Sequence, residues 1–465
     1  MYRSSTRRFF VGVSGVVLLA SATSVAAEPT ALDKLLARTH NVAKEVAKIR
    51  GLPLKTKIPN DVVDKDQLRT RLLAMAGEDK TRRETEAEGL ALARWGLIPL
   101  ATDYSALMID LLTEQVAGYY DPKTKKLTIS KSAGDDPAWA ELVLAHEIDH
   151  GLQDQTFDLE KFEDLPPTEG DAAAARRALV EGDGIALMIE VMLARQGTSA
   201  PWSNPEVTQA IEKAMTVPGN GDALDKAPLA IRDSLIFPYK AGLSFVAALR
   251  RRQPWSAVDA AYAKPPSSTE QIMHPERYLA GDEPVRITLT APAALRDHVI
   301  AHETVWGELS FDLFLRTHGV DPATAATAAE GWGGDRVITL ARSKDSSPSS
   351  SEGANAREAI PIRRPQRAVG IARMEWDSEP DAIEAAEAIE KALDWWTAGA
   401  TIDHSLQRTR WMALDGTVSW VERRGLAVMF VVGAPAWTAE ALATEVWTVS
   451  AVKPPAARAT YRKPR

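Results

Sequence analysis

Two histidines and a glutamate lie close together in the segment 145–150, which reads AHEIDH. His146 and His150 are four positions apart, so on a helix both imidazole rings project from one face and can bind a single ion. Zinc bound in this way lowers the pKa of its water to near neutrality, and an adjacent carboxylate such as Glu147 can take that proton and pass it to a leaving amine. The spacing predicts a hydrolytic zinc centre. The alternative is a helix whose two histidines are ordinary surface or core residues.

Glu181 is the candidate for the third zinc ligand, because catalytic zinc takes three protein ligands and leaves one position open. It lies 31 positions after His150, in an otherwise apolar stretch of a predicted helix, where a carboxylate without a partner would be costly. The alternative is an ion pair between Glu181 and Arg177, one helical turn earlier.

The residues that follow Glu181 carry two further expectations. Gly182 and Gly184 each cost a helix about 1 kcal/mol relative to alanine, which indicates that another element approaches closely there. Asp183 either orients a metal-bound histidine or faces water.

Hydrolysis also needs a hydrogen-bond donor near the oxyanion that develops in the transition state. His274 and Tyr239 are the two candidates. For His274, which precedes a proline, the alternative is a structural role at the end of a helix.

Two other patterns suggest structure rather than chemistry. His298 and His302 are also four positions apart, but no glutamate follows His298, so we predict a solvated helix face. The segment 331–336, GWGGDR, predicts a tight turn with a buried Asp335 or Arg336.

The motif needs a helix to hold it and neighbours to surround it. Asp136 can cap that helix, with Pro137 at its first position. A hairpin is predicted just before it, at 116–130, and Asp171 is expected to cap a second helix that extends to about residue 195. A third helix is expected at about 229–252.

Several segments together resemble an uncharacterised group of predicted secreted bacterial HExxH proteins, and more broadly the gluzincin-type zinc metallopeptidases. The segments read HEIDHGLQDQ, VEGD, AGYYDPKTKKL and SSTEQIMHPERY. The resemblance covers roughly residues 50–280. It implies a helical and α/β fold with a cleft, zinc on His146, His150 and Glu181, and Glu147 as the general base. The hairpin would then supply an edge strand along which an extended peptide could pair.

Composition limits the possible ligands and partners. The chain has 465 residues and no cysteine, so disulfides, thiolate metal ligands and a cysteine nucleophile are excluded. Any metal must therefore be held by imidazole and carboxylate groups. The net charge is −8, which makes nucleic acid an unsuitable partner. Oligomeric state cannot be read from these features.

The first residues predict export. Three arginines at positions 3, 7 and 8 precede an apolar stretch and the small-residue sequence VAA at 25–27, which is typical of a cleaved signal peptide over 1–27. The arginine pair also resembles a twin-arginine signal. Cleavage would move the net charge from −8 to −11 and leave no stable membrane insertion, whereas an uncleaved anchor is the alternative. We expect a periplasmic or secreted protein.

The predicted fold class is α+β. A mostly helical, zincin-like metallopeptidase domain with a short β-sheet is expected at 28–285, and a small α/β domain at 286–452 with a flexible loop at 344–355. A disordered basic tail is expected at 453–465. The expected function is hydrolysis of peptide bonds in a peptide or protein substrate, with Zn2+ as cofactor. The alternative function is a non-catalytic zinc-binding envelope protein in which the C-terminal domain binds a partner.

Overall fold

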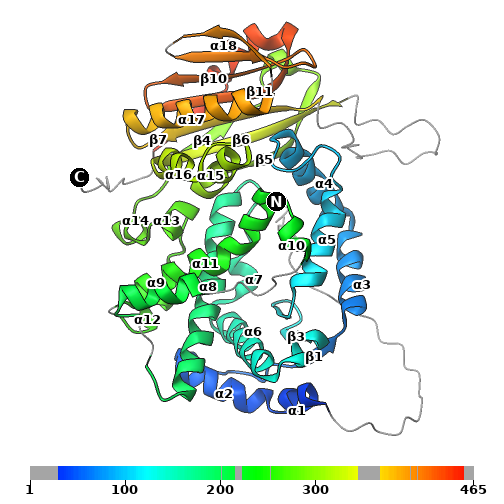
Figure 1. The fold of residues 1–465 in the computed structure, drawn as a ribbon, viewed down its shortest axis with the longest axis vertical. Helices are drawn as coiled ribbons and strands as arrows, with labels where there is room; N and C mark the ends of the chain where they lie inside the picture. Colours follow the sequence, from blue (N-terminus) through cyan, green and yellow to red (C-terminus); the bar gives the residue numbers. More distant parts are fainter. Residues whose placement is uncertain are drawn as a thin grey trace, which may run out of the picture.

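The structure is a computed structural model that describes residues 30–199, 202–214, 222–251, 253–343, 367–397, 399–405 and 407–454. Figure 1 shows a mostly helical region in its lower part and a large β-sheet flanked by helices at its top. The fold is therefore mixed α and β, as the sequence predicts at that coarse level. The predicted signal peptide at 1–27 and the loop at 344–355 lie outside the described residues.

The helical region carries the HExxH motif and contains a small sheet. Its main helices are α1 (Ala31–Ala37), α2 (Thr39–Arg50), α3 (Lys65–Ala76), α4 (Asp79–Arg94), α5 (Tyr104–Gln115), α6 (Pro137–Phe157), α7 (Leu159–Phe162), α8 (Gly170–Arg195), α9 (Pro205–Ala214), α10 (Asp222–Lys226), α11 (Leu229–Arg250), α12 (Ser256–Ala263), α13 (Thr269–Met273) and α14 (Pro275–Ala280). A short 3-10 helix, η1 (Lys131–Asp135), leads into α6.

Helices α6, α8 and α11 form the centre of this region. Gly182 on α8 lies against the backbone of Gly242 on α11, so closely that a Cβ at Gly182 would come within 2.2 Å of the Gly242 carbonyl. The close approach predicted from the glycines of the VEGD segment is confirmed. Hydrophobic residues of α2, α6, α8 and α11 share one core with the small sheet.

The predicted hairpin is also present, as β2 (Gly118–Asp121) and β3 (Lys126–Ser130). A third strand, β1 (Asn60–Val63), pairs in parallel with β3, which gives the order β1-β3-β2. Strand β2 is therefore an edge of this sheet. It packs beside α6, the helix that carries the motif.

The second region is built on a seven-stranded antiparallel sheet in the order β5-β6-β7-β11-β10-β9-β8. Its strands are β5 (His298–Thr304), β6 (Trp332–Arg342), β7 (Val369–Trp376), β8 (Ala400–His404), β9 (Arg408–Met412), β10 (Thr417–Arg424) and β11 (Ala427–Pro435). The helices are α15 (Gly307–Thr317), α16 (Pro322–Glu330), α17 (Glu379–Thr397) and α18 (Ala439–Thr448), and β4 (Arg286–Leu289) pairs with β12 (Ser450–Lys453).

Both faces of the central strands are buried. In β11, Val428 and Phe430 belong to a core with α15, α16 and α17, whereas Met429 and Val431 belong to a core with α18. Alternate side chains of a strand point to opposite faces, so a strand covered on both sides reads as a continuous apolar run. The run AVMFVV in β11 has this pattern.

Three local predictions in this region are wrong. His298 and His302 lie on strand β5 and not on a helix, because this segment, with its β-branched Val299 and Ile300, pairs with β6. The segment 331–336 is not a tight turn, since β6 begins at Trp332; Asp335 and Arg336 are nevertheless buried, as predicted. The predicted tail begins too early, because Lys453 pairs with Arg286.

The predicted cap on α8 is also wrong. The helix begins at Gly170, and Asp171 lies inside its first turn. The buried Asp171 carboxylate instead accepts hydrogen bonds from the backbone N–H (3.0 Å) and the hydroxyl (2.5 Å) of Thr269 at the start of α13. Asp171, which the local pattern assigns to helix capping, thus makes a tertiary contact with α13 instead.

Of the described helices, none combines the length and the apolar character that a membrane span needs.

Replacement of Gly182 by alanine tests the contact between α8 and α11. The added methyl group would meet backbone atoms of Gly242, which cannot rotate away, so we expect the free energy of unfolding to fall by about 3 kcal/mol or more. Chemical denaturation measures this change. Gly77→Ala is the control, since its nearest contact would be an ordinary 3.4 Å, and should alter stability by less than about 1 kcal/mol. A Gly182→Ala protein as stable as its parent would contradict the close packing.

Candidate metal centre

Helix α6 begins as the sequence predicts. The Asp136 carboxylate accepts hydrogen bonds from the backbone N–H groups of Ala138 and Trp139, and Pro137 occupies the first turn. These contacts satisfy donors that a helix start leaves unpaired. The helix then continues for 21 residues and carries the HExxH motif through its buried middle section, where only 9% of His146 and 8% of His150 is exposed.

Glu181 on α8 faces the two histidines of α6. Its Oε2 atom lies 3.3 Å from Nε2 of His146 and 3.5 Å from Nε2 of His150, and the two Nε2 atoms are 3.0 Å apart. In the part of the chain that the structure describes, this is the only set of three or more such side chains close enough to hold one metal ion. Arg177, the alternative partner, contacts Glu163 at 3.3 Å instead.

Glu181 and His150 shift each other's pKa. Burial acts to raise the pKa of Glu181, but the contacts with His146 and His150 outweigh it and hold that pKa well below its usual value. Burial acts to lower the pKa of His150, but Glu181 and then Glu147 outweigh it and raise that pKa to about 10. The cluster thus favours an anionic Glu181, the form that binds a cation.

Glu147 is buried beside these groups. Burial is the main cause that raises its pKa, and the neighbouring histidines and the backbone of Tyr120 oppose the rise. Its Oε2 atom has no hydrogen-bond partner among the described residues. The edge strand β2 passes directly over it, since a Cβ on Gly118 would lie 3.2 Å from Cγ of Glu147. The carboxylate is therefore held against the strand with one oxygen free to accept a proton.

The run QDQ at 153–155 attaches the motif helix to its surroundings. His150 Nδ1 lies 2.9 Å from Gln153 Oε1. Asp154 accepts hydrogen bonds from the Tyr120 hydroxyl at 2.7 Å and from Nζ of Lys125 at 3.0 Å, which fixes the hairpin on α6. Gln155 accepts hydrogen bonds from the backbone N–H groups of residues 55 and 56. None of these three residues has a role that the sequence predicts, although the run lies within the resembling segment HEIDHGLQDQ.

His146 is positioned by a small neighbour. A Cβ built on Gly184 would come 2.7 Å from Cε1 and 2.8 Å from Nδ1 of the His146 ring. The absence of a side chain at Gly184 therefore provides the space in which this ring lies. The second glycine of the α8 segment thus leaves room for the His146 ring, and the first allows close packing against α11.

Asp183 takes neither of the two roles expected for it. It is fully buried and forms a paired contact with Arg50, with Nε to Oδ1 at 2.7 Å and Nη2 to Oδ2 at 2.9 Å. The hydroxyl of Tyr262 donates a further hydrogen bond to it at 2.9 Å. Arg50, itself fully buried, also contacts Asp259 at 2.8 Å. Asp183 thus neutralises the buried cation of Arg50 instead of facing water or a histidine.

The two candidate oxyanion donors have different surroundings. Tyr239 on α11 lies near the cluster, since the charge of Glu181 is the largest cause that raises its pKa, followed by burial and Glu147. His274 instead contacts Glu308 through Nε2 at 2.9 Å. Burial acts to lower the pKa of His274, and Glu308 outweighs it. The charges of Glu181 and Glu147 thus act on Tyr239, whereas His274 is joined to α15.

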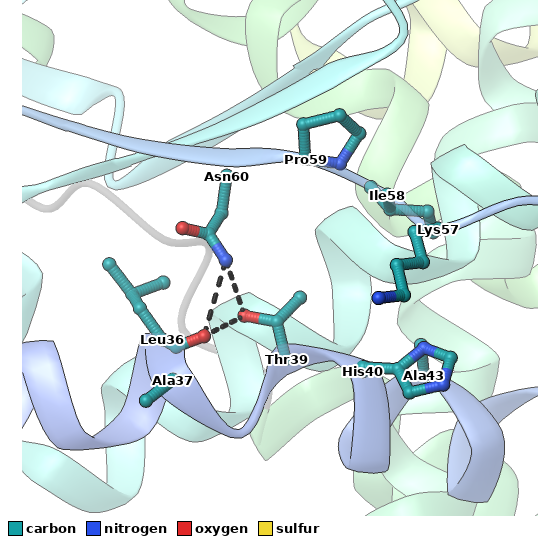
Figure 2. Close-up of a pocket in the computed structure, with 9 residues that line it drawn as sticks. All are labelled: Leu36, Ala37, Thr39, His40, Ala43, Lys57, Ile58, Pro59 and Asn60. Atoms are coloured by element: carbon teal, nitrogen blue, oxygen red, sulfur yellow. Dashed lines mark hydrogen bonds between the residues drawn. The ribbon is translucent and has the colours of Figure 1, made fainter.

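A separate pocket of about 330 Å³ lies where α1 and α2 meet the chain before β1. Figure 2 shows Asn60 pointing into the gap between these helices, where its amide donates hydrogen bonds to the carbonyl of Leu36 at 3.2 Å and to the hydroxyl of Thr39 at 2.9 Å. None of the candidate metal ligands lines this pocket.

Comparison with known proteins bears on the C-terminal region only. Residues 297–443 match a family model described as a domain of unknown function, DUF8575. Searches of the curated proteins and of the solved structures found no match. The matched residues run from the start of β5 into α18, so they lie outside the segment that contains the HExxH motif.

Replacement of Gly184 by alanine tests how the His146 ring is held. The new methyl group would overlap the ring and push it away from Glu181, so we expect zinc affinity to fall by about 10-fold or more. A chelator competition assay measures the affinity. Chemical denaturation of the metal-free protein serves as the control and should show a folded protein, because the overlap with the buried ring is partly offset by the gain of about 1 kcal/mol when alanine replaces glycine in a helix. Unchanged affinity would show that the ring does not need this space.

Proposed function

We propose that this chain is an exported zinc-dependent metallopeptidase with a zincin-like catalytic region. The observation that carries the proposal is the convergence of His146, His150 and Glu181, from two separate helices, beside the buried carboxylate of Glu147. A structural helix pair gains nothing from four buried ionisable groups at one crossing, because each is costly to remove from water.

The geometry of the cluster fits zinc. Ligand atoms bonded to one tetrahedral zinc ion at about 2.0–2.1 Å are separated by about 3.4 Å. The three ligand atoms here are 3.0, 3.3 and 3.5 Å apart. Two imidazoles and one carboxylate also form a ligand set that suits zinc and leaves a fourth position open. Zinc at this position would supply a Lewis acid that brings the pKa of water near neutrality.

Glu147 would act as the general base. It takes a proton from the attacking water and then gives it to the amine that leaves when the peptide bond breaks. Burial, which raises its pKa, makes it a better base than an exposed carboxylate, and its unpartnered Oε2 is the atom available for the proton.

Tyr239 would stabilise the oxyanion. Its raised pKa keeps the phenol protonated at neutral pH, so that it remains a hydrogen-bond donor. A donor placed where negative charge develops is among the largest contributions to such reactions. We do not assign this role to His274, whose Nε2 is engaged with Glu308.

An extended peptide would pair with β2. This strand is an edge of its sheet, and its Gly118 lies against Glu147, so a peptide added there would pass the general base. Together with the predicted signal peptide, this suggests a peptide or protein substrate outside the cytoplasm.

The Glu147→Gln variant tests the catalytic role directly. We expect it to keep bound zinc and to cleave a mixed peptide library at least about 100-fold more slowly, because the amide cannot accept the proton of water. Glu141→Gln is the matched control on the same helix, where Glu141 contacts Arg195 at 3.3 Å and takes no part in the cluster. If the parent protein, fully loaded with zinc, cleaves no peptide, the result would contradict the enzyme and favour the non-catalytic zinc-binding protein.

The Tyr239→Phe variant tests the oxyanion donor. We expect kcat to fall by about 100-fold with little change in KM, because the hydroxyl is needed mainly in the transition state. Steady-state kinetics on one cleaved peptide measure both constants. Tyr278→Phe removes a hydroxyl that donates to the carbonyl of Lys264 at 2.8 Å and should leave kcat unchanged. A normal kcat for Tyr239→Phe would show that another group donates the hydrogen bond to the oxyanion.

A further inference from the structure

We infer that Gln153 is a positioning residue that fixes the ring of His150 for metal binding. The inference rests on the proposed function, because it concerns how the same metal site is built. Gln153 is fully buried one turn after His150 on α6, so its hydrogen bonds are made only to the protein around it. Three of these bonds are well defined, and together they determine which way its amide points.

The amide nitrogen of Gln153 faces two acceptors. Nε2 donates to Oδ2 of Asp149 at 2.8 Å and to the backbone carbonyl of Val180 at 3.3 Å. An amide nitrogen has two hydrogens and no capacity to accept, so both are used. The amide oxygen must therefore face the third partner, which is Nδ1 of His150 at 2.9 Å.

This orientation determines the role of each nitrogen in the His150 ring. The Gln153 oxygen can only accept, so Nδ1 of His150 is the donor in this bond. The lone pair used to bind a metal is then on Nε2, the atom 3.5 Å from Oε2 of Glu181. The hydrogen bond also prevents rotation of the ring. Such outer contacts orient a metal-binding histidine and raise its basicity.

Gln153 also links the two helices that carry the ligands. Through Asp149 and His150 it bonds to α6, and through the Val180 carbonyl it bonds to α8, immediately before Glu181. A single side chain thus sets the orientation of one ligand and the distance to another. Asp149, one of the partners of Gln153, is fully buried, and the charges of Asp183 and Arg50 act on it.

The choice of a neutral amide has a physical reason. Glu147, Glu181 and Asp149 already bring three buried carboxyl groups to this crossing. A carboxylate at position 153 would add a fourth and face Asp149 without a donor between them. Glutamine accepts the histidine hydrogen bond on one side and donates to the carboxylate on the other.

The experiment compares zinc affinities. Gln153→Met keeps the length of the side chain but removes the hydrogen bonds, and we expect the zinc dissociation constant to rise about 10- to 100-fold in a chelator competition assay at fixed pH. Gln155→Met is the matched control, because it removes a glutamine of the same helix that bonds to the chain near residue 55 and not to a ligand. It should bind zinc like the parent.

A double variant separates positioning from a general loss of structure. In Asp149→Asn with Gln153→Glu, the new carboxylate accepts the bond from His150 and the new amide donates to it. The bond that orients the ring is thus kept, and only the bond to the Val180 carbonyl is lost. We expect zinc affinity within about 3-fold of the parent. Thermal melting of the metal-free variants shows that each is folded.

The outcomes are distinct. Parent affinity in Gln153→Met would overturn the inference, and so would a folded double variant that binds zinc as weakly as Gln153→Met. A parent that binds no zinc would overturn both this inference and the proposed function. A parent that binds zinc but cleaves no peptide would overturn the proposed function alone, while the same series of affinities would still support or overturn the role of Gln153.

Discussion

The burial of a carboxylate between two imidazoles is the constraint on which the helical region depends. Glu181, His146 and His150 are largely removed from water at the crossing of α6 and α8, and groups of this kind are costly to bury unless they are paired. The crossing must therefore be held to within a fraction of an ångström. The contact of Gly182 with the α11 backbone and the space beside Gly184 both serve that requirement from the same turn of α8.

The contacts around the crossing extend this constraint outward. Asp154 attaches the hairpin to α6, so the edge strand that lies over Glu147 cannot shift without losing the Tyr120 and Lys125 hydrogen bonds. Arg50 brings α2 and α12 into the same network through Asp183 and Asp259. A buried ion pair is weak evidence for stability, because desolvation offsets attraction, but loss of one partner is costly. We interpret this network as one that fixes the positions of α2, α8 and α12 relative to one another.

The three candidate metal ligands can be predicted from the sequence because each of them has a local signal. A spacing of four residues places two rings on one helix face, and an isolated carboxylate in an apolar helix needs a partner, so the sequence alone is sufficient to group His146, His150 and Glu181. Predictions from local patterns fail at positions whose partners are distant in the sequence. Asp171 bonds to Thr269, and His298 lies on a strand that pairs with residues about forty positions later. The role of Gln153 has no local signal, because it depends on Val180 and Asp149 together.

The two regions also share a core, which a boundary drawn along the sequence does not reveal. Trp95, at the end of α4, is buried against Trp306 and Phe430, with ring centroids 4.8 and 5.3 Å away, and its indole N–H donates to the hydroxyl of Thr339 on β6 at 3.1 Å. A chain that ended near residue 285 would leave this side chain exposed and its donor without a protein partner. Exposure of a tryptophan and loss of a buried hydrogen bond each cost on the order of 1–3 kcal/mol. The helical region is therefore stabilised by its contact with the C-terminal sheet.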